Sequence, residues 1–400
     1  MSVSERWLLP DGVDELLPPE AWAIEQMRRT LLDVYKNFGY ELVSPPLIEF
    51  IESLLTGTGN ELNLQTFKVT DQLTGRLMGV RADITPQIAR IDAHLLDSHS
   101  VNRLCYVNTV LHTRPAHAMT NRSPLQVGCE LFGEPSHAAD LEVISLMLET
   151  LHISGIQNIH IDVAHVGIYK GLLESANFDC STEDKIFDAL GRKSIPELDV
   201  LAANAKSNAD IILLIRDIAN LSGGISSLEE IKRLVESSLL SSPEMVLSAI
   251  EDLQSISKQI KQRFESVEIG FDFCELRGYN YHTGMMFSAF NVDYGHALAK
   301  GGRYDGVGKE FGQPRPATGF SADLKTLFRV AQKNKTSSVS MTREKSILAP
   351  AGNSKELLDK ISELRQSCCV IQLLDELSQE TYGCSQRLVF ESQSWKIEEI

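Results

Sequence analysis

The feature of this sequence that most limits its fold is a helical stretch set between two runs of strand-forming segments. Before residue 167, apolar strand patterns such as "NRLCYVNT", "LQVGCELFG" and "NIHIDVAHV" lie among helical ones. Residues 167–267 carry mainly helical patterns, and strand patterns return in "VEIGFDFCEL", "GMMFSAFNVD" and "HALAKGGRYDG". Strands that resume after such a stretch favour a sheet with an inserted helical subdomain. We therefore predict an α+β fold in which an antiparallel sheet is flanked by helices.

The chain also divides along its length. The stretch "QKNKTSSVSMTRE" is polar and has the composition of a linker. We expect residues 1–330 to form a core that includes the helical insertion at about 167–267, and residues 331–344 to form the linker. Residues 345–400 then make a small C-terminal α/β domain, with a strand, a helix and a strand followed by the strand patterns "QRLVFES" and "SWKIEEI".

Composition and charge exclude several classes of function. The net charge of −16 makes the chain a poor nucleic-acid binder, because such binding depends on lysine and arginine. No apolar stretch reaches the ~20 residues that cross a bilayer, and the acidic, proline-containing N-terminus is unlike a signal peptide, so we expect a cytosolic protein. The seven cysteines have no Cys-x-x-Cys spacing. This argues against a zinc site or disulfides, and neither a metal nor a cofactor is expected.

Four segments concentrate polar side chains at turns or strand ends: "RADITPQ", "TRPAHAMTNRSPLQVGCE", "CELRGYNYHTGMMF" and "KGGRYDG". Residues two apart in a strand share a face, so Gln126, Gly128 and Glu130 point the same way. The amide, the carboxylate and Asp83 would suit a ligand with an ammonium or imidazole group. Each residue also has a structural interpretation, since Asp83 could cap the helix that follows it and His282 could be purely structural.

Taken together, the four segments resemble the catalytic core of histidyl-tRNA synthetases, a class II aminoacyl-tRNA synthetase fold, over about residues 9–330. "LQVGCELFG" resembles that family's Gln-Leu-Gly-Cys-Glu-Val-Phe-Gly, "LRGYNYHTGMMF" its Arg-Gly-Leu-Asp-Tyr-Tyr-Thr-Gly segment, and "GGRYDG" is its hexapeptide. The resemblance implies that Asp83 and Thr85 hold an ammonium group. The histidine-like pocket that it implies consists of Asp83, Thr85, Gln126, Glu130, Arg277, Tyr281, His282 and Tyr304.

Departures from that family indicate lost chemistry. Its second motif begins Phe-Arg-x-Glu, where this chain has Leu-His-Thr-Arg, so His112 takes the arginine position in an ungapped comparison. The third motif ends Gly-Leu-Glu-Arg, where this chain has Asp-Leu-Lys-Thr, so Thr326 replaces its arginine. Removing one preorganised donor from a charged transition state typically costs about 2.7–4 kcal/mol. Residues 345–400 are also too few for the family's anticodon-binding domain of about 100 residues.

A synthetase-like core with these losses resembles the regulatory subunits of ATP phosphoribosyltransferase. The resemblance implies a subunit without catalytic residues that activates a short-form catalytic chain in the first step of histidine biosynthesis and contributes to feedback inhibition by histidine. It also implies a homodimer within a hetero-octamer, and a pocket that could bind histidine. No acid-acid-x-x-Thr-Gly pattern for phosphoribosyl transfer is present. The alternatives are a degenerate histidyl-tRNA synthetase, an amino-acid ligase that activates histidine with ATP, or a histidine sensor without a catalytic partner.

Overall fold

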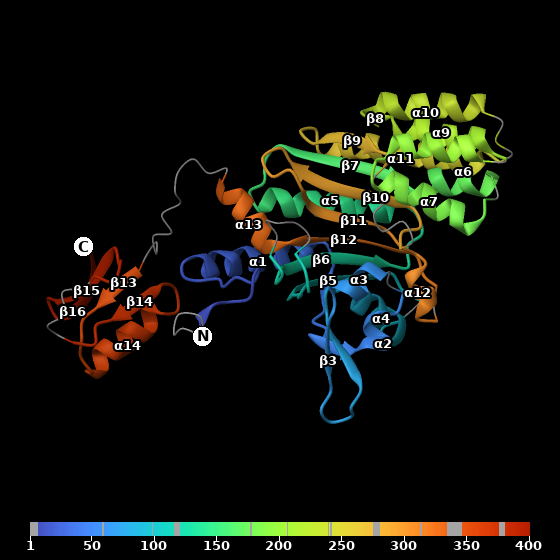
Figure 1. Ribbon diagram of the computed structural model, residues 1–400. Helices are drawn as coiled ribbons and strands as arrows, with labels where there is room; N and C mark the ends of the chain where they lie inside the picture. The colour runs from blue at the N-terminus through green and yellow to red at the C-terminus, as the bar shows by residue number, and fades with distance from the viewer. Residues whose placement is uncertain are drawn as a thin grey trace. The chain divides into compact units, whose positions relative to one another are not determined.

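The computed structural model describes most of the chain in two compact units, Met1–Asn334 and Lys335–Ile400. The described residues are 7–57, 60–97, 99–115, 121–176, 178–205, 207–238, 240, 242–274, 281–312, 314–333, 346–375 and 381–400. Of the segment predicted as a linker, residues 331–333 belong to a helix and residues 334–344 lie outside the described residues. Figure 1 labels helices and strands of both units.

The first unit is built on a nine-stranded sheet of order β1-β5-β6-β12-β11-β10-β7-β9-β8. Neighbouring strands run antiparallel except for the β1–β5 and β7–β9 pairs, which are parallel. The predicted α+β class with a largely antiparallel sheet is therefore confirmed. The strands are β1 (Glu41–Leu42), β5 (Asn102–Thr109), β6 (Leu125–Phe132), β7 (Ile159–His165), β8 (Ser222–Gly223), β9 (Glu268–Asp272), β10 (Met285–Asn291), β11 (Ala297–Arg303) and β12 (Ala317–Asp323).

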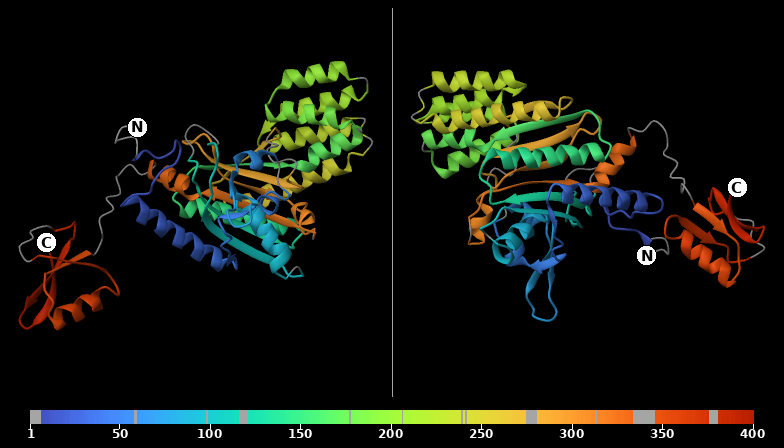
Figure 2. Two further views of the ribbon diagram at one scale, coloured as in Figure 1. Left: turned by 60° about the horizontal axis from the view of Figure 1, so that its bottom comes forward. Right: turned by 180° about the vertical axis from the view of Figure 1, so that it is seen from behind.

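One face of this sheet is covered by α5 (His137–Ile153), which packs against β12, β11, β6 and β10. Figure 2 shows from behind how this helix crosses the strands. The helix buries residues on every side, including Val143, Ile144, Leu146 and Met147, as expected for a helix enclosed by other elements. The covered face therefore holds the core, and the opposite face of the central strands remains for a site.

A second group of elements precedes and flanks the sheet. A three-stranded sheet has the order β2-β4-β3, and the β3–β4 hairpin projects from the unit (Figure 1). Pro45 and Pro46 lie between β1 and β2, consistent with the exclusion of proline from paired ladders. The bounds are α1 (Glu20–Asn37), β2 (Ile48–Phe50), α2 (Ile51–Leu54), α3 (Asn60–Gln65), β3 (Phe67–Thr70), β4 (Leu77–Val80), α4 (Thr85–Leu95), α12 (Val307–Glu310) and α13 (Leu324–Lys333).

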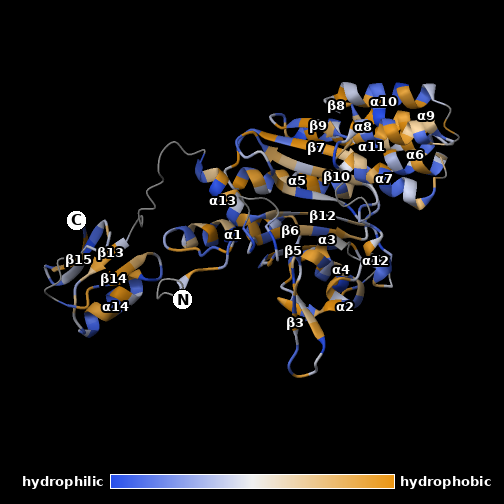
Figure 3. Cartoon of the chain, viewed as in Figure 1, coloured by the Kyte–Doolittle hydropathy of each residue, from blue (hydrophilic) through white to orange (hydrophobic). Residues whose placement is uncertain are grey.

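Helices fill the chain between β7 and β9, apart from the two-residue β8, and they gather at one end of the sheet (Figure 1). The longest, α11, buries residues three or four positions apart, including Val246, Ile250, Leu253 and Ile260, and packs against α6 and α5. Figure 3 shows hydrophilic and hydrophobic residues along each of these helices. Their bounds are α6 (Val166–Ala176), α7 (Cys180–Gly191), α8 (Ile195–Asn204), α9 (Ala209–Ala219), α10 (Ile225–Ser237) and α11 (Glu244–Arg263).

The C-terminal unit is a four-stranded sheet of order β14-β13-β15-β16 with one helix. Its small core is formed by Ile347, Ala349, Leu357, Ile361, Val370 and Leu388. Ser354 caps the helix by accepting a hydrogen bond from Leu357 N. The bounds are β13 (Ser346–Ala349), α14 (Lys355–Leu364), β14 (Cys369–Gln372), β15 (Gln386–Glu391) and β16 (Ser394–Glu399). Among the described residues of both units, no helix has the length and apolarity to cross a bilayer.

Candidate functional site

A cavity of about 220 Å³ lies on the face of the large sheet opposite α5. Its described lining includes residues from β6, β7, β10, β11 and β12, together with the turn before α4. The volume is just below the ~300–1,000 Å³ of pockets for drug-sized ligands, which fits a small molecule of amino-acid size. Six predicted residues line this cavity: Asp83, Thr85, Glu130, Tyr281, His282 and Tyr304.

Glu130 is the centre of the hydrogen-bonding network in the cavity. Its side chain accepts hydrogen bonds at Oε1 from Thr85 Oγ1 (2.9 Å) and Tyr106 OH (3.0 Å), and at Oε2 from Tyr304 OH. Glu130 is only 1% exposed. Burial raises the pKa of Glu130 to about 8 and outweighs the three hydroxyl groups, which lower it. At pH 7 the carboxyl is therefore largely protonated, and a cationic group beside it would favour the carboxylate.

Two glycines make room for this network. Gly319 on β12 lies directly opposite Glu130 on β6, and a Cβ atom at position 319 would lie 1.6 Å from Glu130 Oε2. A Cβ atom at position 128 would lie 2.5 Å from both Tyr106 OH and Phe320 O. Both distances are well below van der Waals contact, so the carboxyl and the tyrosine hydroxyl occupy space that only glycine leaves free.

Asp83 and Gln126 form the second polar group at the cavity. Gln126 Nε2 donates to Asp83 Oδ1 (2.8 Å), and Gln126 Oε1 accepts from Ile84 N (3.0 Å). Asp83 Oδ1 also accepts from Thr85 N (3.1 Å), and no side chain caps the helix itself at Ile84. Asp83 thus fixes the turn before α4 while it lines the cavity. Gln126 is not itself among the described residues that line the cavity, so its hydrogen bond positions Asp83 without facing the ligand space.

Tyr281 and His282 close another side of the cavity. The Tyr281 ring stacks on the Tyr304 ring with centroids 5.1 Å apart and meets the His282 ring edge-on at 5.4 Å. The buried hydroxyl of Tyr281 has no hydrogen-bond partner within the described residues. A buried polar atom without a partner is costly, so this hydroxyl is a candidate to contact a ligand. Burial lowers the pKa of His282 to about 4, and the ring is therefore neutral at pH 7.

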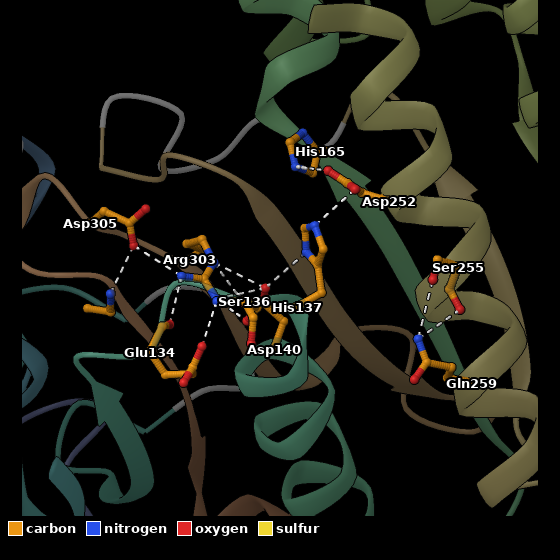
Figure 4. A network of polar contacts seen from close by, with 11 residues as sticks. Glu134, Ser136, His137, Asp140, His165, Asp252, Ser255, Gln259, Arg303 and Asp305 are labelled. Carbon is orange, nitrogen blue, oxygen red and sulfur yellow. Dashed lines mark hydrogen bonds and ion pairs between the residues drawn. The ribbon is translucent and has the colours of Figure 1, made fainter. Parts of the chain in front are cut away.

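The hexapeptide that carries Tyr304 is fixed by its arginine (Figure 4). Arg303 Nη2 donates to Asp140 Oδ2 (2.9 Å) and to Ser136 O (3.1 Å), which anchors β11 to the first turn of α5. From that turn, His137 Nε2 contacts Asp252 Oδ1 of α11 at 2.9 Å. A hydrogen bond with Asp140 raises the pKa of His137, and Asp252 raises it further. The network connects the strand beneath the cavity to the helical insertion.

The side chains at the positions that correspond to the nucleotide motifs form hydrogen bonds with other groups of the chain. His112 Nε2 bonds to Ala82 O (2.9 Å), and Thr326 Oγ1 donates to Asp323 Oδ2 (2.6 Å). Lys325, only 7% exposed, donates to Asp14 Oδ1 at 2.8 Å. The Asp14 carboxylate also accepts from Arg329 and from Asn121. A segment near the N-terminus thus supplies the anion that these cations bind.

Sequence reasoning overlooked residues that complete the site. Tyr106 and Gly319 shape the surroundings of Glu130. Alternation along β5 gives only the face that Tyr106 shares with Leu104, and its place beside Glu130 comes from the pairing of β5 with β6. Arg277 lies outside the described residues. Burial raises the pKa of Cys274 to about 11, and its thiol donates to Ala219 O, so it is a packed side chain. Within the described part of the chain, no cluster of His, Cys, Asp and Glu could hold a metal ion.

Comparisons with known proteins divide the chain at the same place as its structure. Residues 12–327 match the family model described as histidyl-tRNA synthetase, and residues 344–398 match the model described as the ATP phosphoribosyltransferase subunit HisZ C-terminal domain. An ATP phosphoribosyltransferase regulatory subunit from Marinobacter nauticus is 49% identical over 100% of both chains. Another, from Hahella chejuensis, is 46% identical over 100% of this chain and 98% of its own.

Solved structures share the fold. An ATP phosphoribosyltransferase regulatory subunit/histidyl-tRNA synthetase from Bacillus halodurans C has a TM-score of 0.79 and 23% identity, covering 95% of this chain and 96% of its own. A histidyl-tRNA synthetase from Nostoc has a TM-score of 0.77 and 17% identity, covering 98% and 97%. The ATP phosphoribosyl transferase (HisG:HisZ) complex from Thermotoga maritima contains a chain with a TM-score of 0.58 and 19% identity, covering 74% and 96%.

Proposed function

Because the chain belongs to the family of ATP phosphoribosyltransferase regulatory subunits, we propose that it does no chemistry itself and activates a separate short-form catalytic chain at the first step of histidine biosynthesis. The observation that carries this proposal is 49% identity, over the full length of both chains, to a relative of that name. A regulatory subunit acts by binding its partner's conformations unequally, so no reacting group of its own is required. The acidic composition and the scattered cysteines favour a cytosolic site of action.

The nucleotide side of the site supports a non-catalytic role. ATP activation requires fixed cations at the phosphates. Here Lys325 and Arg329 are paired with the Asp14 carboxylate, and Asp323 stands where the third motif of the synthetases has glycine. Burial raises the pKa of Asp323. Its hydrogen bonds with Thr326 and with backbone N–H groups act in the opposite direction and lower this pKa. A nucleotide would have to displace these contacts without the arginines that the synthetases provide.

The amino-acid side supports binding of histidine as the feedback signal. Glu130, Asp83 and the Tyr281 hydroxyl offer acceptors or donors to an imidazole and an ammonium group. Arg277 belongs to the same proposed pocket and was assigned from the sequence alone. Titration of the chain with histidine should release heat, and Glu130→Ala should abolish that heat. No heat in either protein would make these residues structural relics of the fold.

The proposed assembly is a homodimer that joins catalytic dimers in a hetero-octamer. Large hydrophobic side chains are exposed at the end of α1 and along β1 and β2, in the segment "FGYELVSPPLIEF", which resembles the first motif of class II synthetases, a helix and strand at the dimer interface. They include Phe38, Leu42, Leu47 and Ile48, which are 40–56% exposed. β1 is also an edge strand, which has backbone groups available for further contacts. We propose that a second copy of this chain covers this surface.

One experiment tests the proposed function directly. The purified chain is mixed with a short-form catalytic subunit, and mass and phosphoribosyl transfer are measured on the same sample. We expect a complex of both chains with a turnover above that of the catalytic subunit alone. If the mixture shows neither a complex nor activation, the proposal is wrong. Histidine-dependent ATP–pyrophosphate exchange by the chain alone would instead support the enzymatic alternative.

A further inference from the structure

The first turn of α5 holds a histidine with a carboxylate on each side of its ring (Figure 4). His137 Nε2 lies 2.9 Å from Asp252 Oδ1 of α11, and His137 Nδ1 lies 3.6 Å from Asp140 Oδ2 of its own helix. A neutral imidazole carries one N–H and an imidazolium carries two, so only the protonated ring can donate toward both carboxylates at once. This arrangement, the His137 bridge, therefore suits the imidazolium form.

The two carboxylates of the His137 bridge belong to different parts of the first unit. Asp140 is fully buried and also accepts hydrogen bonds from Arg303 on β11, at Oδ1 from Nε (3.2 Å) and at Oδ2 from Nη2 (2.9 Å). Asp252 lies on α11, which belongs to the helical insertion. The bridge thus joins the insertion to the carboxylate that anchors β11, the strand that leads into Tyr304 of the cavity.

A second polar contact between α5 and α11 offers a comparison. Arg263 Nη1 on α11 donates to Ser145 Oγ on α5 at 3.1 Å. A guanidinium stays protonated at any pH at which the chain is folded, so this contact does not depend on pH. The two helices are therefore joined by one polar contact that titrates near neutral pH and by another that does not.

The titration near neutral pH belongs to His137. Its hydrogen bond with Asp140 raises the pKa of His137, burial lowers it, and Asp252 raises it further. The bridge therefore contributes fully below pH 6.5 and loses this contribution as the pH rises through the raised pKa. Burial lowers the pKa of His165, the other histidine beside Asp252, to about 4, so that ring is neutral near pH 7. The remaining charged groups that act on His137, Asp252 or His165 are Arg303, Glu251 and Lys170.

We propose that His137, as an imidazolium, is a positioning residue that holds the helical insertion to the strand beneath the cavity, and that it releases the insertion as the pH rises. The side chain is 47% exposed, so its ring exchanges protons with the solvent. Loss of the proton leaves one N–H for two carboxylates, and one end of the bridge opens. This inference goes beyond the proposed function and does not depend on histidine binding.

NMR titration of the histidine rings tests the proton-dependent part. His137 should titrate above pH 6.5 in the wild type, and Asp252→Asn should shift its midpoint to lower pH, because the imidazolium loses one of its anions. The missing resonance of His137→Gln identifies the signal. His99, an exposed histidine between α4 and β5, is the internal control and should titrate alike in both proteins. An unchanged midpoint for His137 in Asp252→Asn overturns the proposal.

Hydrogen exchange of the α11 amides tests the hold on the insertion. At about pH 6, His137→Gln should exchange these amides about two- to fivefold faster than the wild type, the effect of a half-exposed ion pair. At about pH 8.5 the two proteins should exchange alike, whereas His137→Arg, which stays charged, should exchange more slowly than both. Ser145→Ala removes the other contact between the same helices and should speed exchange by one factor at both pH values.

Comparison at the same pH isolates the bridge, because all of these proteins keep Glu130 and its own titration affects them equally. Equal exchange by the wild type and His137→Gln at about pH 6 overturns the proposal. A difference of the same size at both pH values also overturns it, because the contact of His137 would then not depend on the proton. If His137→Gln fails to fold, Asp252→Asn provides the same test from the other side of the bridge. No measurement involves histidine as a ligand, so each outcome stands whether or not the cavity binds it.

Discussion

The proposed amino-acid side of the site and the positions that correspond to the nucleotide motifs (the nucleotide side) differ in how their polar groups are satisfied. On the amino-acid side, Glu130 and the Tyr281 hydroxyl line a cavity, and the Tyr281 hydroxyl lacks a partner among the described residues. On the nucleotide side, Lys325 and His112 bond to distant parts of the chain, and Thr326 bonds to the nearby Asp323. Buried polar atoms nearly always have a partner, so the Tyr281 hydroxyl differs from the polar groups at the nucleotide-motif positions, which already have theirs.

The stability of the two sides should therefore respond differently to substitution. Polar groups on the amino-acid side are held in a geometry that costs free energy when no ligand is present, because a carboxyl is buried away from water. On the nucleotide side, the buried Lys325 has the Asp14 carboxylate as its partner, and removing that partner would leave an uncompensated charge. Four substitution experiments test this difference, in order of decreasing expected effect.

The largest effect is expected from Glu130→Gln. The pKa of Glu130 is about 8 in the folded chain against an ordinary value of 4.5. The folded state thus retains a proton that the unfolded state releases, and this contribution to stability is full below pH 4.5 and lost as the pH rises through 8. Between about pH 5 and pH 9, the wild type should lose stability on the order of a few kcal/mol relative to the variant.

The measurement is chemical unfolding at several pH values. Glu251→Gln, at an exposed position on α11, is the control and should show the pH dependence of the wild type. If Glu130→Gln retains that pH dependence too, the carboxyl is not the buried titrating group inferred here.

Gly319→Ala should have the next largest effect. The added methyl group would lie 1.6 Å from Glu130 Oε2, so the carboxyl must leave its hydroxyl partners or the strands must separate. Overpacking of this kind typically costs about 1–3 kcal/mol, and histidine binding should be lost with it. Gly191→Ala is the matched control, because apart from its chain neighbours and its own helix backbone no described atom lies within 4 Å of its Cβ position. An unchanged unfolding temperature and unchanged titration for Gly319→Ala would contradict the described packing.

Asp14→Asn tests the nucleotide side. Burial raises the pKa of Asp14, but hydrogen bonds from Lys325 and Arg329 outweigh it and hold this pKa below its ordinary value. The carboxylate therefore stabilises the fold above pH 3.8, and this contribution is lost as the pH falls. At pH 7 the substitution should destabilise the chain by about 1–2 kcal/mol, because the buried Lys325 loses its anion.

Denaturant midpoints measure this change. Asp11→Asn is the control, since Asp11 contacts Arg122 through its backbone oxygen and keeps that contact as asparagine. If Asp11→Asn shifts the denaturant midpoint as much as Asp14→Asn does, the pairing of Asp14 with Lys325 and Arg329 does not stabilise the fold as inferred.

The smallest effect is expected from the combination of His112→Arg and Thr326→Arg. These changes supply the arginines that the synthetase motifs carry, yet Asp323 and the Asp14 pairing remain in place. We expect no histidine-dependent ATP–pyrophosphate exchange above that of the wild type, with an active histidyl-tRNA synthetase assayed in parallel. Exchange by the double variant would mean that the nucleotide side lacks only its cations.

Much of this molecule could be predicted because its signals are local. The alternation in β6 placed Gln126 and Glu130 on one face, and the prolines at 45 and 46 lie between two strands because proline is excluded from paired ladders. The position of Tyr106 in the site could not be inferred in this way, because it depends on β5 pairing with β6. The pairing of Asp14 with Lys325 joins residues at opposite ends of the first unit. No local pattern records such contacts.

The order of residue types along the chain was enough to determine the sheet with its helical insertion and the family, because strand and helix periodicities and the motif residues are written in consecutive positions. Only the tertiary structure decided which polar groups face a cavity and which bond to another part of the chain. It brings a glycine against Glu130 to leave room for a carboxyl, and it brings Asp14 against Lys325. Charge and space in a site depend on neighbours that strand pairing and packing supply, and these neighbours are distant in the sequence.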